Sequence, residues 1–176
     1  DTLAALQEAK SRGALALGVI NVVGSSIARE TDAGIYLRVG PEIGVASTKA
    51  FTAQLSVLAC LAIAAGRARG TVSADEERAM VQALLEVPNY ATAILSDSAQ
   101  IERVAERVAK ANHVIYLGRG NCFPIAMEGA LKLKEITYID AEGYASGEMK
   151  HGPIALIDET VPVVAIVPSG PLFEKS

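Results

Sequence analysis

The chain has no tryptophan, only two cysteines and only two histidines among its 176 residues. The cysteines, Cys60 and Cys122, form no metal-ligand spacing and no disulfide framework, so we expect no metal site. Thiols used so sparingly favour a reducing compartment, and we expect a cytoplasmic protein. The net charge is −4 and aromatic residues make up 5% of the chain, so no basic surface with interleaved aromatics is available for nucleic acid.

Long hydrophobic runs are missing as well. The longest uninterrupted apolar run covers residues 57–65, which is too short to cross a bilayer, so we expect no membrane partner. The Gly118-Arg119-Gly120 turn lacks the full dinucleotide-binding glycine pattern, which argues against a nicotinamide cofactor. No signal peptide is visible, and because the chain begins at Asp1 rather than Met we interpret it as a piece of a longer protein.

The composition that is present, 51% hydrophobic and 20% charged, is that of a globular protein. Strand-like and helix-like segments alternate, which predicts an α/β fold with a parallel sheet sandwiched by helices, of the flavodoxin-like or Rossmann type. Ser73 with Glu76, and Asp97 with Gln100, are spaced to start two of the helices, and Pro88 is expected to divide them. We expect strands at 15–23, 35–39, 113–118 and 161–167, and helices at 1–12, 48–65, 123–136 and within 66–112.

Groups able to transfer protons are concentrated between residues 128 and 153. Glu128, Lys132 and Glu135 recur at i, i+4 and i+7, which places them on one stripe of one helix. His151 follows in a Lys-His-Gly-Pro turn, so a carboxylate, an ammonium and an imidazole are available together. Two other interpretations stay open, namely a surface salt-bridge stripe and a structural histidine.

A second candidate region is the polar loop at 40–51. Val45, Ala46 and Ser47 offer small side chains and backbone amides at the start of a helix, which suits sugar hydroxyls or a phosphate. The alternative is ordinary helix capping by Ser47 or Thr48, with Lys49 in solvent.

Three motifs point to a family. GPEIGVASTKAF, LGRGNCFPIAMEGALKLKEITYI and GEMKHGPIALID closely resemble the isomerase (SIS, sugar isomerase) region of the glucosamine-6-phosphate synthases, which are also called glutamine–fructose-6-phosphate aminotransferases. The likeness extends along the whole chain and includes GVINVVGSSIARETD. It implies parts of two tandem SIS domains: residues 1–70 from the first, connecting helices at 71–111, and residues 112–176 from the second. The two parts are also interpretable as halves that assemble as one SIS-like unit, within a chain or by exchange between chains.

The resemblance implies roles for the candidate residues. Glu135 matches the acid/base that moves a proton between C1 and C2 of the sugar, and Lys132 matches a second position near the reacting carbons. His151 matches the residue implicated in ring opening, which in the family reaches the site of a neighbouring subunit. Glu128, at the start of the same motif, is a weaker candidate.

The loop at 40–51 also has a counterpart in the family. Val45 and Ser47 match positions that contact the sugar, and Ala46 lies between them. The family converts fructose 6-phosphate and glutamine-derived ammonia into glucosamine 6-phosphate in amino-sugar biosynthesis, and the resemblance implies no cofactor. It further implies a homodimer and a glutaminase domain in the parent chain. Two alternatives remain, a ketose/aldose phosphate isomerase and a non-catalytic SIS module that senses a sugar phosphate.

Several parts of the family's machinery have no match within these residues. The family's phosphate loop would precede Asp1, its Schiff-base lysine lies near its C-terminus, and neither Cys60 nor Cys122 matches its glutaminase nucleophile. We therefore expect these 176 residues to be inactive alone. Residues 163–176 resemble the strand, loop and helix start that would precede Asp1 in the first repeat.

Overall fold

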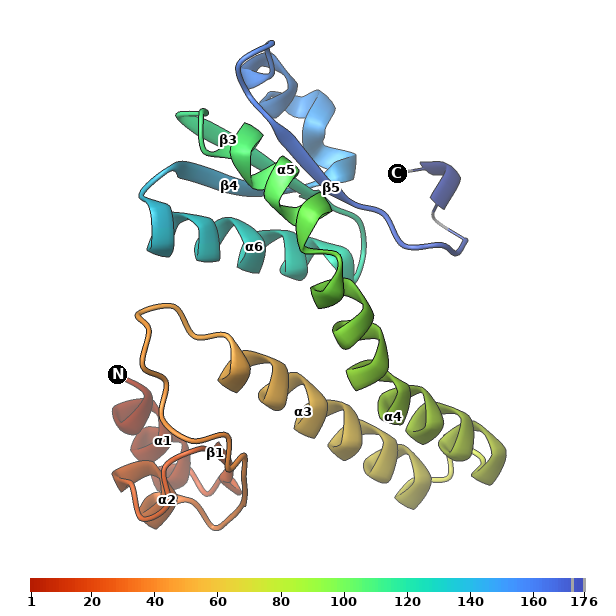
Figure 1. Cartoon of the computed structure of the whole chain (residues 1–176). Helices are drawn as coiled ribbons and strands as arrows, with labels where there is room; N and C mark the ends of the chain where they lie inside the picture. Colours follow the sequence, from red (N-terminus) through yellow and green to blue (C-terminus); the bar gives the residue numbers. More distant parts are fainter. Residues whose placement is uncertain (172, 176) are drawn as a thin grey trace. The chain divides into compact units, whose positions relative to one another are not determined.

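The structure is a computed structural model that describes residues 1–171 and 173–175 (Figure 1). Its contacts divide the chain into two compact units, Asp1–Thr92 and Ala93–Ser176. The division predicted from the family, at residues 70 and 111, stays a prediction. Leu172 and Ser176, which belong to the repeat-like segment at 163–176, lie outside the described residues.

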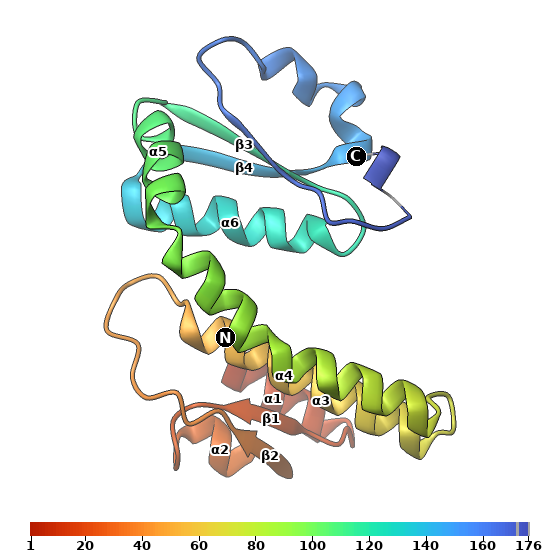
Figure 2. The same cartoon turned by 45° about the vertical axis from the view of Figure 1, so that its right-hand side comes forward.

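The first unit contains a small parallel sheet with helices beside it (Figure 2). Asp32 fixes the start of this sheet, because its carboxylate accepts the Ala16 N–H at 2.8 Å and pairs with Lys10 at 3.0 Å. The bond from the Ala16 amide lowers the pKa of the Asp32 carboxyl, so the contact persists at neutral pH. The elements are α1 (Thr2–Ser11), β1 (Leu17–Ile20), α2 (Ser26–Glu30), β2 (Ala33–Tyr36) and α3 (Lys49–Ala68), followed by most of α4 (Ala74–Ser96).

The loop that follows β2 is tied to the carboxyl end of β1 by Asn21. The Asn21 amide donates to the Gly40 carbonyl at 2.7 Å and accepts the Val39 N–H at 3.1 Å. A side chain that bonds backbone groups in both directions fixes their position better than a single bond does. The loop at 40–48 therefore starts from a defined point beside β1.

Helix α4 begins as predicted but does not end where predicted. Ser73 and Glu76 exchange hydrogen bonds at 2.8 and 3.2 Å, which confirms the capping box. The expected break at Pro88 is wrong, because α4 continues through this proline to Ser96. The break comes at Asp97 instead, whose carboxylate accepts the Gln100 N–H and starts α5 (Ser98–Val108). Asp97 therefore separates α4 from α5. The N–H that Pro88 lacks does not interrupt α4.

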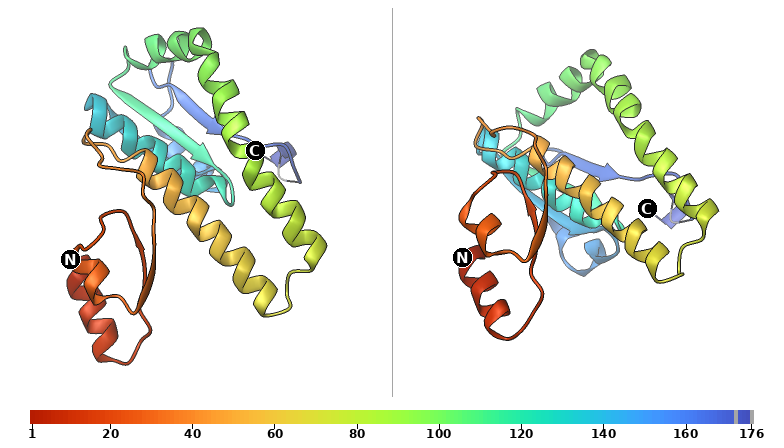
Figure 3. Two further views of the ribbon diagram at one scale, coloured as in Figure 1. Left: turned by 60° about the horizontal axis from the view of Figure 1, so that its bottom comes forward. Right: turned by 90° about the horizontal axis from the view of Figure 1, so that it is seen from below.

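Helices α3 and α4 are joined by a short turn (Figure 3). Arg67 closes this turn, since its guanidinium donates to the Val72 carbonyl at 2.9 Å and pairs with Glu77 at 2.8 Å. Among the described residues α3 is the one helix long and apolar enough to cross a membrane, by length and composition only. Only 6% of that window is buried. A single helix of this kind is weak evidence for a membrane span, because core helices of soluble proteins and signal sequences pass the same test.

The second unit is built on a three-stranded parallel sheet with the order β4-β3-β5. Helix α6 lies on one side of the sheet, and the short turns η1 and η2 lie on the other (Figure 2). The predicted α/β class, with parallel strands flanked by helices, is confirmed. The elements after α5 are β3 (His113–Gly118), α6 (Cys122–Thr137), β4 (Asp140–Ala145), η1 (Ser146–His151), η2 (Pro153–Leu156), β5 (Val163–Ile166) and η3 (Phe173–Lys175).

The core of the second unit lies between the sheet and its two helices. Val114 of β3, Ala130 of α6 and Ala141 of β4 are at most 2% exposed and pack together. Val108 of α5 and Val164 of β5 pack against this cluster, so both helices cover the same face. The remaining contributors are Ala111, Tyr116, Leu133 and Ile139.

Strand β4 was not predicted, and its residues explain why. The sequence DAEGYA has no β-branched residue and contains a glycine, so it does not look like a strand. Gly143 is needed because a Cβ there would meet the Met127 Cα of α6 at 2.7 Å. Close helix packing and pairing with β3 therefore determine this strand, and local preference does not.

Candidate active site

The Glu128–Lys132–Glu135 stripe forms a cluster of charges on α6. The Lys132 ammonium lies 2.6 Å from a Glu135 carboxylate oxygen and 3.6 Å from a Glu128 oxygen. The three side chains are 21–30% exposed, less than expected of a fully solvated face. The hydrogen bond that Lys132 donates to Glu135 is the main cause that raises the pKa of the Lys132 ammonium, and the charges of both glutamates raise it further against the effect of desolvation, so the ammonium stays charged at neutral pH.

The start of α6 is set by the glycine turn after β3. A Cβ on Gly118 would meet the Cys122 carbonyl oxygen at 2.1 Å, and Gly120 has a positive φ of 55°. Only glycine permits the helix to begin so close to the end of the strand. This turn fixes the rotation of α6 and with it the face that carries the charge cluster.

The charge cluster lies away from the edge of the sheet at which α6 begins. At 1.5 Å per residue, Glu135 lies roughly 20 Å along the helix axis from Cys122. The Glu135 end of the cluster is therefore nearer the amino edge of the sheet, whereas a site at the carboxyl edge would lie beside Cys122. Helix α6 begins after the carboxyl end of β3 and runs back antiparallel to the strands, so Glu135 lies towards the far end of the helix.

His151 lies at the other edge of the same sheet. It is the last residue of η1, which follows the carboxyl end of β4, and its side chain is exposed. Met149 in the same turn is 8% exposed, and Gly152 has a φ of 139°, a conformation that favours glycine. Within one chain the structure thus keeps His151 and Glu135 apart.

The loop at 40–48 is organised by a residue that was not predicted. The expected cap by Ser47 or Thr48 is wrong, because Thr48 is the N-cap of α3 but makes no side-chain capping bond. Instead, one carboxylate oxygen of Glu42 accepts the Ala50 N–H at 2.9 Å and the Thr48 N–H at 3.2 Å. It also accepts the Ser47 hydroxyl at 3.4 Å. The sequence does contain a signal for this contact, because an acidic residue shortly before a helix start can stabilise the positive end of the helix.

This arrangement changes what the loop can bind. The Thr48 and Ala50 amides, at the start of α3, are already bonded to a carboxylate and do not face a ligand. Val45 is 91% exposed, while Ala46 and Ser47 are partly buried. The loop belongs to the first unit and the charge cluster to the second.

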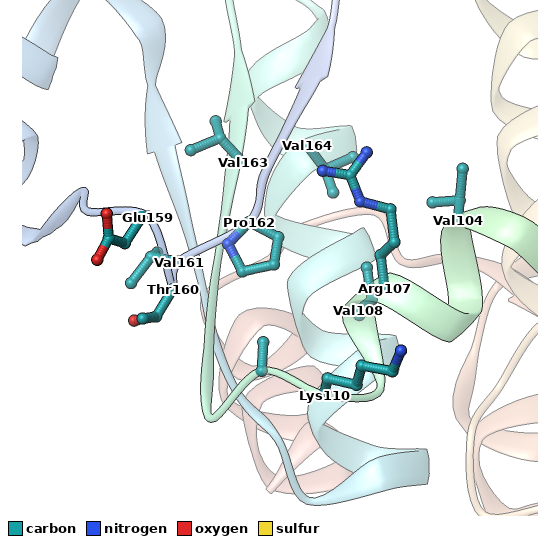
Figure 4. A pocket seen from close by; sticks show the side chains of 11 residues that line it. Val104, Arg107, Val108, Lys110, Glu159, Thr160, Val161, Pro162, Val163 and Val164 are labelled. Atoms are coloured by element: carbon teal, nitrogen blue, oxygen red, sulfur yellow. The ribbon is translucent and has the colours of Figure 1, made fainter.

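Two cavities in the second unit contain none of the predicted site residues. One, of about 610 Å³, lies between the end of α5 and the segment that leads into β5 (Figure 4). Arg107 and Lys110 line it on the α5 side, and Glu159 lines it opposite. The other, of about 750 Å³, is mainly apolar and lies between α5 and the sheet. Across residues 1–171 and 173–175, no group of three or more His, Cys, Asp or Glu side chains could hold a metal ion.

The fold and these motifs define a class of protein. The SIS domain family matches residues 1–64 and 107–176, and the chain belongs to this family.

Individual relatives confirm the resemblance to one enzyme group. The chain is 58% identical over 176 residues to a protein of Brucella abortus named glutamine–fructose-6-phosphate aminotransferase (isomerizing), and 58% identical to one of the same name from Bradyrhizobium diazoefficiens. Each match covers the whole of this chain but only 29% of the relative's length. The C-terminal domain of glucosamine-fructose-6-phosphate aminotransferase from Francisella tularensis matches with a TM-score of 0.95 at 40% identity, covering 99% of this chain and 49% of that one.

Proposed function

We propose that this chain is the sugar-phosphate isomerising part of a glutamine–fructose-6-phosphate aminotransferase, acting in amino-sugar biosynthesis. The observation that carries the proposal is the half-buried Glu128–Lys132–Glu135 cluster within a chain 58% identical to relatives of that name. The chain spans less than a third of those relatives, so the complete reaction belongs to a longer protein.

The cluster supplies the chemistry that ketose-to-aldose conversion needs. The Glu135 carboxylate removes a proton from one sugar carbon and returns it to the next, which a single base can do. The Lys132 ammonium stabilises negative charge on the sugar oxygen as it develops. His151 serves ring opening, since imidazole exchanges protons near neutral pH. Val45, Ala46 and Ser47 contact the sugar, and none of these steps requires a metal or cofactor.

The opposite positions of Glu135 and His151 support a shared site. One chain presents them at different edges of its second sheet, so a single copy does not readily bring both to one sugar. A homodimer in which His151 serves the neighbouring subunit resolves this separation.

We place the protein in the cytoplasm, because both described cysteines are free thiols.

A chimera tests the proposal directly. Residues 1–176 replace the matching segment of the Brucella abortus relative, and the chimera is assayed for glucosamine 6-phosphate formed from fructose 6-phosphate and glutamine. We expect activity, and growth without glucosamine in a strain that lacks its own enzyme. A folded chimera that interconverts sugar phosphates without transferring nitrogen would favour a plain ketose/aldose phosphate isomerase. A chimera that binds the sugar phosphate without turnover would favour a sensing module.

We predict that His151→Asn in this chimera slows turnover of cyclic fructose 6-phosphate more than turnover of an open-chain analogue, because only the cyclic sugar needs ring opening. Steady-state rates with both substrates measure the difference. Mixing this variant with a Glu135→Gln variant should restore part of the activity through hybrid sites. Equal losses on both substrates, or no recovery after proven subunit exchange, would indicate a structural histidine in an unshared site.

We also predict that the 176-residue chain alone binds fructose 6-phosphate weakly. The resemblance places the phosphate loop outside these residues, and Glu42 already occupies amides that would otherwise attract an anion. Calorimetric titration at neutral pH is the measurement, with inorganic phosphate as the control ligand. Binding in the micromolar range would show that the turn at 168–171, or an exchanged chain, rebuilds the site.

A further inference from the structure

The loop at 40–48 is held at both ends and free in its middle. Asn21 bonds Val39 and Gly40 at the start, and Glu42 bonds Thr48 and Ala50 at the end. Between these points Ile43 is 94% exposed and Val45 is 91% exposed. Neither apolar side chain has burial to fix it, so polar contacts at the two ends determine where this segment lies.

All three donors on Glu42 converge on the same carboxylate oxygen. The Ala50 and Thr48 amides and the Ser47 hydroxyl all bond this atom, while the second oxygen is not needed for the arrangement. The Ala50 amide is the main cause that lowers the pKa of Glu42. The carboxylate is therefore ionised at neutral pH and accepts hydrogen bonds only.

An acceptor-only partner fixes the polarity of Ser47. The Ser47 proton points toward Glu42, so the lone pairs of the hydroxyl oxygen are left for a ligand. In this orientation the Ser47 oxygen can accept a hydrogen bond from a donor such as a sugar hydroxyl. The ionised carboxylate also compensates the positive end of α3, which makes the helix start a poor place for a second anion such as the sugar phosphate.

We propose that Glu42 is a positioning residue for sugar binding: it holds the 45–47 segment and orients the Ser47 hydroxyl as an acceptor for the substrate. This inference rests on the proposed function, because it takes Val45 and Ser47 as sugar contacts. Glu42 acts through this segment and does not touch the reacting carbons.

Three variants of the chimera test the role. Glu42→Ala removes the acceptor, and we expect kcat/KM for fructose 6-phosphate to fall roughly tenfold to a hundredfold, mostly through a higher KM. Glu42→Gln keeps an oxygen where all three donors converge and should restore most of the activity. Glu42→Asp is one methylene shorter and should resemble the alanine variant.

Glu76→Ala is the matched control. Glu76 also caps a helix, accepting the Ser73 N–H at 2.8 Å, and the same kind of bond lowers its pKa. Its loss should lower the melting temperature without changing KM. If Glu42→Ala changes only the melting temperature, as this control does, the positioning role is wrong. Equal inactivity of the alanine and glutamine variants would also overturn it, because the charge itself would then be required.

Hydrogen exchange separates this inference from the proposed function. In the chimera, Glu42→Ala should increase exchange of the Thr48 and Ala50 amides, whereas Glu76→Ala should leave them unchanged. An inactive parent chimera would refute the proposed function, while faster exchange in the alanine variant would still support control of the loop by Glu42. Unchanged exchange at both amides would refute that control.

Discussion

Glu135→Gln is expected to abolish isomerisation in the chimera while largely sparing the binding of fructose 6-phosphate. The amide cannot accept a proton from carbon, so the rate should fall at least about 10²-fold, the lower range for a positioned acid/base. Binding should persist, because the sugar contacts proposed at Val45 and Ser47 lie on another segment. Turnover and sugar-phosphate affinity are measured on the same preparation.

Lys134→Gln is the control for this experiment. Lys134 lies on the same helix next to Glu135 in sequence, and no ion pair to it is found in the described part of the chain. We expect nearly unchanged turnover. Turnover near the parent level in the Glu135 variant would mean that the cluster is an ordinary salt-bridge stripe without a catalytic role.

Gly118→Ala is expected to have the largest effect on stability. Its Cβ would lie 2.1 Å from the Cys122 carbonyl oxygen and 2.7 Å from the Phe123 nitrogen, and both atoms belong to the backbone. Backbone atoms cannot turn aside as a side-chain tip can, so β3 and the start of α6 must move apart. We expect a loss of about 3 kcal/mol, the upper range for overpacking.

Thermal unfolding of the 176-residue chain, followed by circular dichroism, measures this change. The melting temperature should fall by roughly 6–12 °C for such a loss in a chain of this size. Gly147→Ala is the control, because its Cβ would meet only the tip of Arg119, at 3.8 Å. Equal melting temperatures for the two variants would mean that the turn after β3 tolerates a side chain.

Much of the fold was predictable where burial and local pattern agree. Strand β3 has the predicted bounds, because Val114 and Ile115 form a fully buried apolar run between polar turns. The start of α4 was predictable because its cap is made by residues three apart. Strand β4 was not, because its formation depends on Gly143 fitting against a helix that precedes it in the chain.

The candidate site shows the same limit. Spacing alone places Lys132 and Glu135 on one stripe, and the structure joins them at 2.6 Å. The separation of Glu135 from His151 was not predictable, because it depends on the directions of α6 and β4 in space. The contact of Glu42 with Ala50 was not predictable for a related reason, since it joins residues eight apart and depends on how the loop between them folds.

The Lys132 ammonium lies closer to Glu135 than to Glu128, and this affects the order in which charges change during the proposed reaction. Its ammonium is bonded to Glu135 and lies farther from Glu128, so the charge on Glu135 holds it in place. In the mechanism that we propose, Glu135 becomes neutral when it takes a proton from the sugar, and it then stops attracting the ammonium. At that same moment a substrate oxygen becomes negative. The ammonium is thus freed from Glu135 in the same step that creates the negative substrate oxygen. It returns to Glu135 when this carboxyl group gives the proton to the next carbon.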